Sequence, residues 1–219
     1  MNNDILPYIV LDWNNKIVGN ISVWHLYNNI KLFVMERTML EIKPYNREFA
    51  YAYAARWAFE RNPLFYNFTG IGGDCTSFVS QCIYAGCCEM NYDKTNGWYY
   101  VDLNDRSPSW SGVSFFYDFM TTNKLNGPFG RETGIEDIEI GDAVQLMNKM
   151  ERYYHTLIVT GKDRGKILVS AHSDDAFNRR LDSYTFAGAR YIHIEGYREY
   201  VKDKNICFSN LYEGISLHS

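Results

Sequence analysis

The chain changes its hydrophobic period once, and this change restricts its fold more than any other feature. Apolar residues recur at helical spacing in three segments between residues 45 and 125. From Glu139 onwards, short segments rich in β-branched and aromatic residues alternate with turn residues. Because helices precede a run of strands joined by turns, the sequence predicts an α+β domain with an antiparallel sheet.

The first two helices have distinct start and stop signals. The segment 45–62, YNREFAYAYAARWAFERN, predicts the first helix, which Asn46 can cap and Pro63 ends. The second predicted helix begins at or just before Cys75, and we expect it to end at Gly86.

A third helix is predicted over 111–125, where Ser111 can act as its cap. Strand segments follow it, and a turn at Lys162–Gly165 joins the second of them to the third as a hairpin. These strand segments are 142–148, 153–161, 166–173 and 189–197.

The chain divides into three parts by its pattern of predicted helices and strands. Residues 1–40 form an appendage of unknown role, with two strands predicted around Asn14-Asn15 and a strand or short helix over 29–42. Residues 41–200 form the main domain, and 201–219 form a C-terminal tail. The N-terminus lacks the basic region of a signal peptide, and no apolar run approaches the roughly eighteen residues of a membrane span. We therefore expect a cytoplasmic protein.

Charge and cysteine content exclude several classes of protein. A net charge of −4 argues against nucleic-acid binding. The five cysteines are odd in number and clustered, which does not indicate a disulfide framework. We expect Cys82, Cys87 and Cys88 to be small buried side chains in a reducing compartment. Because no Cys-x-x-Cys pair occurs and no histidine lies near the cluster, we expect no metal and no cofactor.

Cys75 stands where a cysteine can be a nucleophile. It follows Gly72-Gly73-Asp74 and begins a helix, whose N-terminus favours the thiolate over the thiol. We expect the carboxylate of Asp74 to cap the helix, and the backbone N–H of Cys75 to bind an oxyanion. The glycines allow a substrate to approach the backbone closely, which places Gly73 and Asp74 in the substrate site. The alternative is a buried cysteine beside a glycine turn.

Two histidines are candidates for the base and its partner. His155 begins one predicted strand and His172 ends the next, and the midpoint between them falls inside the turn that joins the strands. Antiparallel pairing would make the two neighbours, with His155 as the base and His172 as the residue that orients it. Asp174 and Asp175 are alternatives for the orienting role. A surface histidine pair is the simpler interpretation, and two histidines alone are too few to indicate a metal site.

Aromatic residues are concentrated in the predicted loop 91–110. We expect them to line a substrate groove, because loops on a rigid scaffold often carry recognition. The alternative is that they only cover the core. The residues concerned are Trp98, Tyr99, Tyr100 and Trp110.

Several stretches together resemble a known family. YNREFAYAYAARWAFERNPLFYNF, GGDCTSFVSQ, WYY, SPSW, IGDAVQL and HTLIVT occur in this order between residue 45 and about residue 195. They resemble the putative amidase domain family of bacteria, a relative of the NlpC/P60 papain-like cysteine peptidases. The resemblance implies a papain-like fold in which Cys75 is the nucleophile, His155 the base and His172 the orienting residue.

The resemblance also implies an activity. It predicts a cysteine amidase or peptidase that cleaves an amide bond through a thioester, with a peptide or small amide as substrate and peptidoglycan peptides as the first candidate. Two alternatives stay open. One is a thioester acyltransferase of the transglutaminase kind, and the other is a binding module on the same fold without catalysis.

Overall fold

A computed structural model of the chain describes residues 8–11, 17–21, 40–199 and 205–217. The chain forms two compact units, Met1–Leu40 and Glu41–Ser219. In the first unit, β1 (Tyr8–Leu11) pairs antiparallel with β2 (Ile17–Ile21), which confirms the predicted strands. Most of the segment 29–42, predicted as a strand or short helix, lies outside the described residues.

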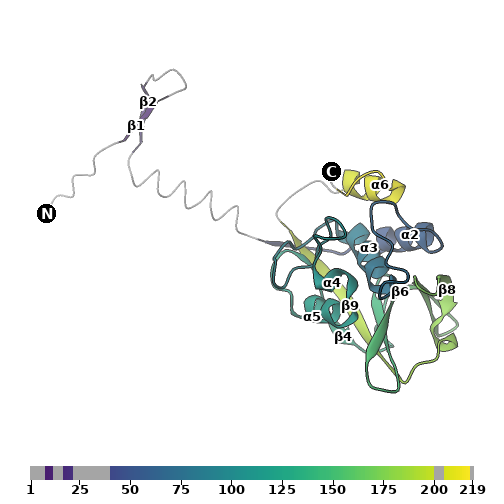
Figure 1. Ribbon diagram of the computed structural model, residues 1–219. Coiled ribbons are helices and arrows are strands. Elements are labelled where there is room, and N and C mark those ends of the chain that lie inside the picture. Colours follow the sequence, from purple (N-terminus) through teal and green to yellow (C-terminus); the bar gives the residue numbers. More distant parts are fainter. Residues whose placement is uncertain (1–7, 12–16, 22–39, 200–204, 218–219) are drawn as a thin grey trace. The chain divides into compact units, whose positions relative to one another are not determined.

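The second unit is the predicted α+β domain with an antiparallel sheet. The sheet follows the order β3-β9-β5-β6-β7-β8 (Figure 1). Strands β3 and β5 pair with different parts of one edge of β9, and β4 pairs with its opposite edge. Strands β3, β4 and β8 do not appear among the predicted strands. The bounds are β3 (Glu41–Lys43), β4 (Gly127–Thr133), β5 (Ala143–Met147), β6 (Tyr153–Asp163), β7 (Lys166–Ala171), β8 (Ala176–Arg180) and β9 (Gly188–Glu199).

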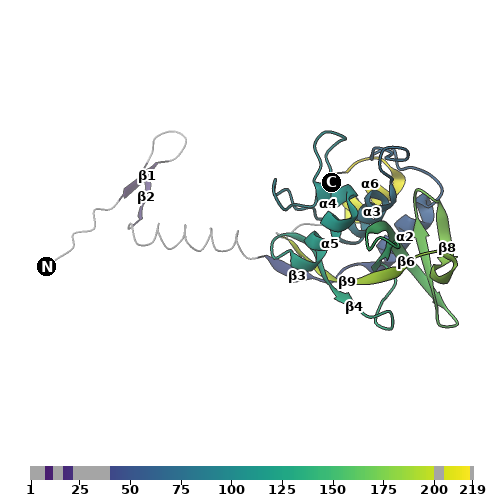
Figure 2. The same ribbon diagram turned by 60° about the horizontal axis from the view of Figure 1, so that its bottom comes forward.

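The helices gather over one face of the sheet (Figure 2). Asn46 caps the first of them as predicted, since its side chain accepts a hydrogen bond from the N–H of Phe49 at 3.0 Å. The predicted third helix corresponds to α5, whose N-cap is Gly112 rather than Ser111, and the short α4 lies before it at the end of the predicted loop 91–110. The bounds are α2 (Arg47–Trp57), α3 (Cys75–Cys87), α4 (Pro108–Ser111), α5 (Val113–Thr122), α6 (Asn205–Glu213) and the 3₁₀ turn η1 (Leu181–Ser183).

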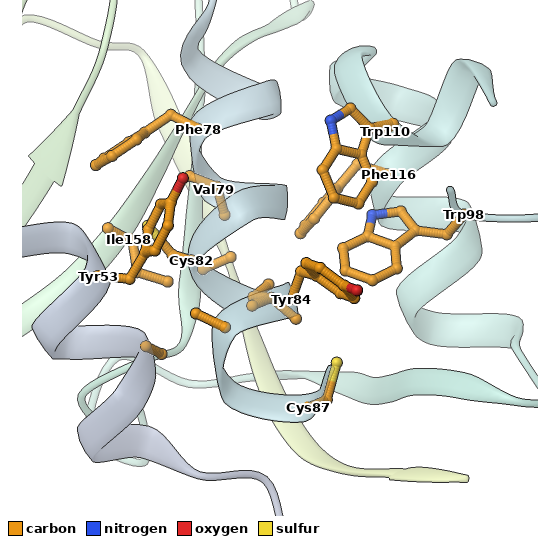
Figure 3. Packing of buried hydrophobic residues seen from close by; sticks show 14 of the residues in the cluster. Tyr53, Phe78, Val79, Cys82, Tyr84, Cys87, Trp98, Trp110, Phe116 and Ile158 are labelled. Carbon is orange, nitrogen blue, oxygen red and sulfur yellow. The ribbon is translucent and has the colours of Figure 1, made fainter. Parts of the chain in front are cut away.

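Helix α3 lies at the centre of the domain, and all of its residues are buried. Tyr53 and Ile158 pack on one side of it, and Trp98 and Trp110 on the other (Figure 3). A helix covered on every side needs small residues where another chain segment approaches closely. Gly86 is such a residue, because a Cβ there would lie 2.2 Å from the Tyr45 ring. Gly86 therefore permits close packing and does not end the helix.

A disulfide joins Cys88, just after α3, to Cys207 in α6. Cys207 and Leu211 are buried against the core, so α6 is a packed helix within the segment 201–219 that we predicted as a tail. The expectation that Cys88 is a reduced, purely apolar side chain is also wrong. Disulfides are typical of oxidising compartments, so the cysteines do not support the reducing compartment that we expected.

A buried ionic network ties the start of α2 to the turn before β5. The Asp142 carboxylate is fully buried and lies 2.7 Å from Nη1 of Arg47 and 2.8 Å from Nδ1 of His193. It also accepts hydrogen bonds from the backbone N–H groups of Glu139 (2.7 Å) and Ile194 (3.0 Å). One carboxylate thus fixes the entry of β5, the strand that lies between β9 and β6.

We expect Asp142→Ala to lower the free energy of unfolding by about 3 kcal/mol, because it removes the buried carboxylate that pairs with Arg47 and leaves two backbone N–H groups without their acceptor. Urea unfolding followed by circular dichroism measures this loss. The matched control is Glu139→Gln, since the Glu139 carboxylate also pairs with Arg47 but is 57% exposed. The control should cost less than about 1 kcal/mol, and equal losses in both variants would contradict the assignment.

Candidate active site

Cys75 and His155 line the same cavity, whose volume is about 320 Å³. Gly73, a predicted substrate-site residue, also lines it, as does Asp174, one of the alternatives for the orienting role. The structure therefore brings together the proposed nucleophile and base, from the start of α3 and the start of β6. The complete lining is Gly72, Gly73, Cys75, Tyr154, His155, Ser173, Asp174 and Tyr184.

The loop before Cys75 needs its glycines for backbone conformation. Gly72 and Gly73 have φ of 91° and 98°, which L-residues with side chains rarely adopt. A Cβ on Gly72 would meet no atom within 4 Å, so this part of the loop faces open space. The loop is anchored from across the site, because the Asp74 N–H donates to Oγ of Ser173 at 2.8 Å.

The cavity lies at an open edge of the sheet. The pairs between β6 and β7 stop at Ile158 opposite Ser170, while β6 begins at Tyr153. The first residues of β6, His155 among them, therefore extend beyond the paired part of β7 and face the loop that carries Ser173. This edge is where Cys75 contacts the strand.

Contrary to our prediction, the side chain of His172 does not contact that of His155. Ile158 pairs with Ser170, and if this register is continued along both strands, His172 comes opposite Thr156 and not opposite His155. Neighbouring residues of a strand point to opposite faces of the sheet, so a displacement of one position moves a side chain to the other face. The side chain of Thr156 contacts α3, and His172 lies on that same side of the sheet.

Both ring nitrogens of His172 have other partners. Nδ1 lies 2.7 Å from Oδ2 of Asp74, and Nε2 donates to the Trp57 carbonyl oxygen at 2.8 Å. The ring is 1% exposed and stacks on Phe78 with 3.8 Å between ring centroids. The predicted hydrogen bond between His172 and His155 is therefore wrong. Asp175, an alternative for the orienting role, has another partner, because its carboxylate accepts hydrogen bonds from Arg61.

Asp74 does not cap α3, in contrast to our prediction. Its side chain makes no hydrogen bond to the first turn of the helix. The carboxylate bonds instead to His172, pairs with Nε of Arg61 at 3.1 Å and accepts from the Phe68 N–H at 3.3 Å. The N–H groups at the start of α3 are thus left without a side-chain cap, and Asp74 is buried outside the cavity lining.

The aromatic loop residues belong to the core, so the predicted groove is wrong. Trp98 and Trp110 are fully buried, and Tyr99 and Tyr100 are at most 4% exposed. The rings pack on one another, with 4.8 Å between the centroids of Trp98 and Trp110. None of them lines the cavity beside Cys75. Burial of large aromatic area against α3 explains their concentration in this loop.

Comparison with known proteins places the chain in a family. Residues 44–195, which include the helices α2 to α5 and nearly the whole sheet, match the model of the family described as "Putative amidase domain". The chain belongs to this family. It is also 30% identical over 136 residues to the uncharacterized protein YhbB of Bacillus subtilis (strain 168), a match that covers 60% of this chain and 42% of that protein. No solved structure matches the chain.

The described part of this amidase domain holds no group of metal-binding side chains, and none of its helices is long and apolar enough to cross a bilayer. Ser173 and Tyr184 line the cavity but were not among the predicted site residues. Tyr184 follows the 3₁₀ turn η1 and Ser173 has φ of 75°, and neither position has a periodic or motif signal.

Burial sets the protonation of the reactive pair. It raises the pKa of the Cys75 thiol, although the Thr156 N–H and the hydroxyl of Thr76 oppose this change. It lowers the pKa of His155 to about 4, against the opposing charge of Asp174. Burial thus outweighs the helix N-terminus that we expected to lower the thiol pKa. The resting pair at neutral pH is a thiol beside a neutral imidazole, and a neutral imidazole can accept a proton.

We expect the His155 ring of this amidase domain to titrate near pH 4, because burial disfavours the imidazolium. Nuclear magnetic resonance of the ring C–H signals measures the midpoint, and His155→Gln identifies the signal by removing it. A midpoint near the ordinary value of about 6.5 would contradict the burial argument.

The same shift has a consequence for stability. Between pH 6.5 and about 4, the unfolded chain binds a proton at His155 that the folded chain does not, so the free energy of unfolding falls as the pH is lowered through this range. We expect this fall to be smaller in His155→Gln, measured by urea unfolding at a series of pH values. Equal pH dependence in the two proteins would show that His155 is not the group responsible.

Proposed function

We propose that the domain is a cysteine hydrolase of amide bonds in which Cys75 is the nucleophile and His155 the general base. The observation that carries this proposal is that both side chains line one cavity beside an uncapped helix N-terminus. Membership of the amidase family supports the bond type. The resemblance to NlpC/P60 peptidases supports a papain-like fold, and the central helix packed on an antiparallel sheet agrees with it.

The mechanism uses the neutral pair directly. As Sγ of Cys75 attacks the amide carbonyl carbon, His155 takes the thiol proton, and a tetrahedral intermediate forms. His155 then gives this proton to the leaving nitrogen, the C–N bond breaks, and a thioester and a free amine result. Water attacks the thioester with His155 again as base, which releases the carboxylic acid and restores the thiol.

The N-terminus of α3 is suited to the charge that develops on the carbonyl oxygen. A capping carboxylate at Asp74 would occupy the first N–H groups of the helix and repel an oxyanion. The ion pair of Asp74 with Arg61 and its hydrogen bond with His172 hold that carboxylate away from this position. We assign the oxyanion to the N–H of Cys75, and we assign His172 to positioning Asp74 and not to orienting His155.

The substrate proposal rests on the resemblance alone. Peptides or small amides of the bacterial cell wall are the first candidates, because enzymes of this fold commonly cleave them. The cavity of about 320 Å³ is large enough for part of a peptide on either side of one amide bond.

An activated ester tests the mechanism without knowledge of the natural substrate. We expect 4-nitrophenyl acetate to give a burst of nitrophenolate and to leave one acetyl group on Cys75, as detected by mass spectrometry of peptides. Cys75→Ala should give no burst. His155→Ala should slow acylation by roughly 10²–10⁴-fold, the usual range for general acid–base catalysis.

The matched control is Cys82→Ala, which removes another free and buried cysteine of α3. It should keep the burst. Acetylation of Cys82 or Cys87 in preference to Cys75 would overturn the assignment of the nucleophile. Addition of an amine separates hydrolase from acyltransferase, since an acyltransferase would give more N-acetyl product than acetate.

A further inference from the structure

A row of polar residues crosses the interior of the sheet and ends at the nucleophile helix. On β5, Gln145 lies directly opposite Arg190 of β9 on one side and Thr156 of β6 on the other. Residues directly opposite each other in antiparallel strands share one face of the sheet. That face is covered by α3, where Oγ1 of Thr76 lies 2.8 Å from Oγ1 of Thr156.

Arg190 fixes the direction of the first two hydrogen bonds along this row. A guanidinium group only donates, so Nε of Arg190 donates to Oε1 of Gln145 at 2.7 Å. The amide nitrogen of Gln145 then faces the other way. It donates to Oγ1 of Thr156 at 3.2 Å and to the Val113 carbonyl oxygen at 2.8 Å.

The last two hydroxyls continue the same direction. Oγ1 of Thr156 accepts from Gln145, which leaves its own hydrogen for Oγ1 of Thr76. A thiolate at Sγ of Cys75 can only accept, so Oγ1 of Thr76, 3.8 Å away, would donate to it and accept from Thr156. The four hydrogen bonds therefore run from a cation to the sulfur atom, and each donor is polarised by the one before it.

Three of the four members of the row are buried in the core, and Arg190 is half-buried. Gln145, Thr156 and Thr76 are all fully buried, although apolar residues would fill these core positions at less cost. Arg190 is held between two rings, with its guanidinium 3.5 Å from the centroid of Tyr117 and 3.9 Å from that of Tyr153. A hydrogen-bond chain in such surroundings interacts strongly with a charge that forms at its end.

We propose that Arg190, Gln145, Thr156 and Thr76 form a directed donor chain that stabilises the negative charge on Sγ of Cys75. These are positioning residues and do not touch the substrate. The proposal rests on the proposed function in assigning the nucleophile to Cys75, but its central quantity, the stability of the thiolate, can be measured on the thiol itself. His155 takes the proton from one face of β6, and the chain supports the resulting anion from the other.

The experiment is the pH dependence of Cys75 alkylation by iodoacetamide, followed at this residue by mass spectrometry of peptides. Thr156→Val keeps the shape of the side chain and breaks the chain in its middle. We expect the midpoint for Cys75 alkylation to rise, by up to about one pH unit, because Thr76 loses the donor that polarises its hydroxyl toward the sulfur. Thr156→Ser restores the hydroxyl and should restore the midpoint.

Thr160 supplies a matched control. It is also a buried threonine of β6, four residues from Thr156, and its hydroxyl has no hydrogen-bond partner in the described part of the chain. Thr160→Val should leave the alkylation midpoint unchanged. A second variant, Arg190→Gln, removes the cation at the far end of the chain and should raise the midpoint by less than Thr156→Val does.

All these variants retain the charged and titratable groups nearest to Cys75, which are Asp74, Tyr154, His155, Asp174, Arg179 and Tyr184. An unchanged midpoint in folded Thr156→Val, or an equal rise in Thr160→Val, overturns the donor chain. Should Thr156→Val fail to fold, an unchanged midpoint in Arg190→Gln overturns it. If the midpoint shifts as expected but no acetyl-Cys75 forms, the donor chain stands and the proposed function fails.

Discussion

The burial of α3 on every side is the constraint on which the rest of the domain depends. A helix enclosed in this way can expose only its ends, and the first of these ends carries Cys75. Its polar residues need internal partners, and each of those partners fixes a neighbouring element. Ser80 accepts from the Trp98 indole and donates to the Trp110 carbonyl oxygen, while Gln81 accepts from Tyr53 of α2. The scaffold and the site are therefore built by the same helix.

The elements with local signals could be predicted from the sequence. The Asn46 cap, the helical start at Cys75 and the turn before Lys166 follow from side-chain chemistry within a few residues, and all of them occur in the structure. Strand β8 could not be predicted, because its alternation of buried and exposed residues is weak. The disulfide was missed for a different reason, since Cys88 and Cys207 are 119 residues apart and only packing brings them together.

The errors at the site have a common physical origin. The partners of His172 depend on the register of the hairpin, and the register shifts between Val159 and Gly161, which symmetry about the turn does not anticipate. Asp74 had the right residue type for a cap, but the Arg61 cation and the His172 ring offer its carboxylate partners from other parts of the chain. A buried carboxylate gains more from such partners than from the helix N–H groups. Local propensity therefore failed where a tertiary ion pair competed with it.

The two faces of β6 have separate tasks at its first residues. His155 points to the face with Tyr184, in a cavity whose burial keeps its imidazole neutral and able to accept a proton. Thr156, the next residue, points to α3 and links Gln145 to Thr76 in the row of polar residues that begins at Arg190. Because adjacent side chains of a strand point to opposite faces, the proposed base and the proposed donor chain can act on Cys75 from the two faces of β6. The unpaired edge of β6 makes this possible, since a full β7 partner there would occupy the space in which Cys75 lies.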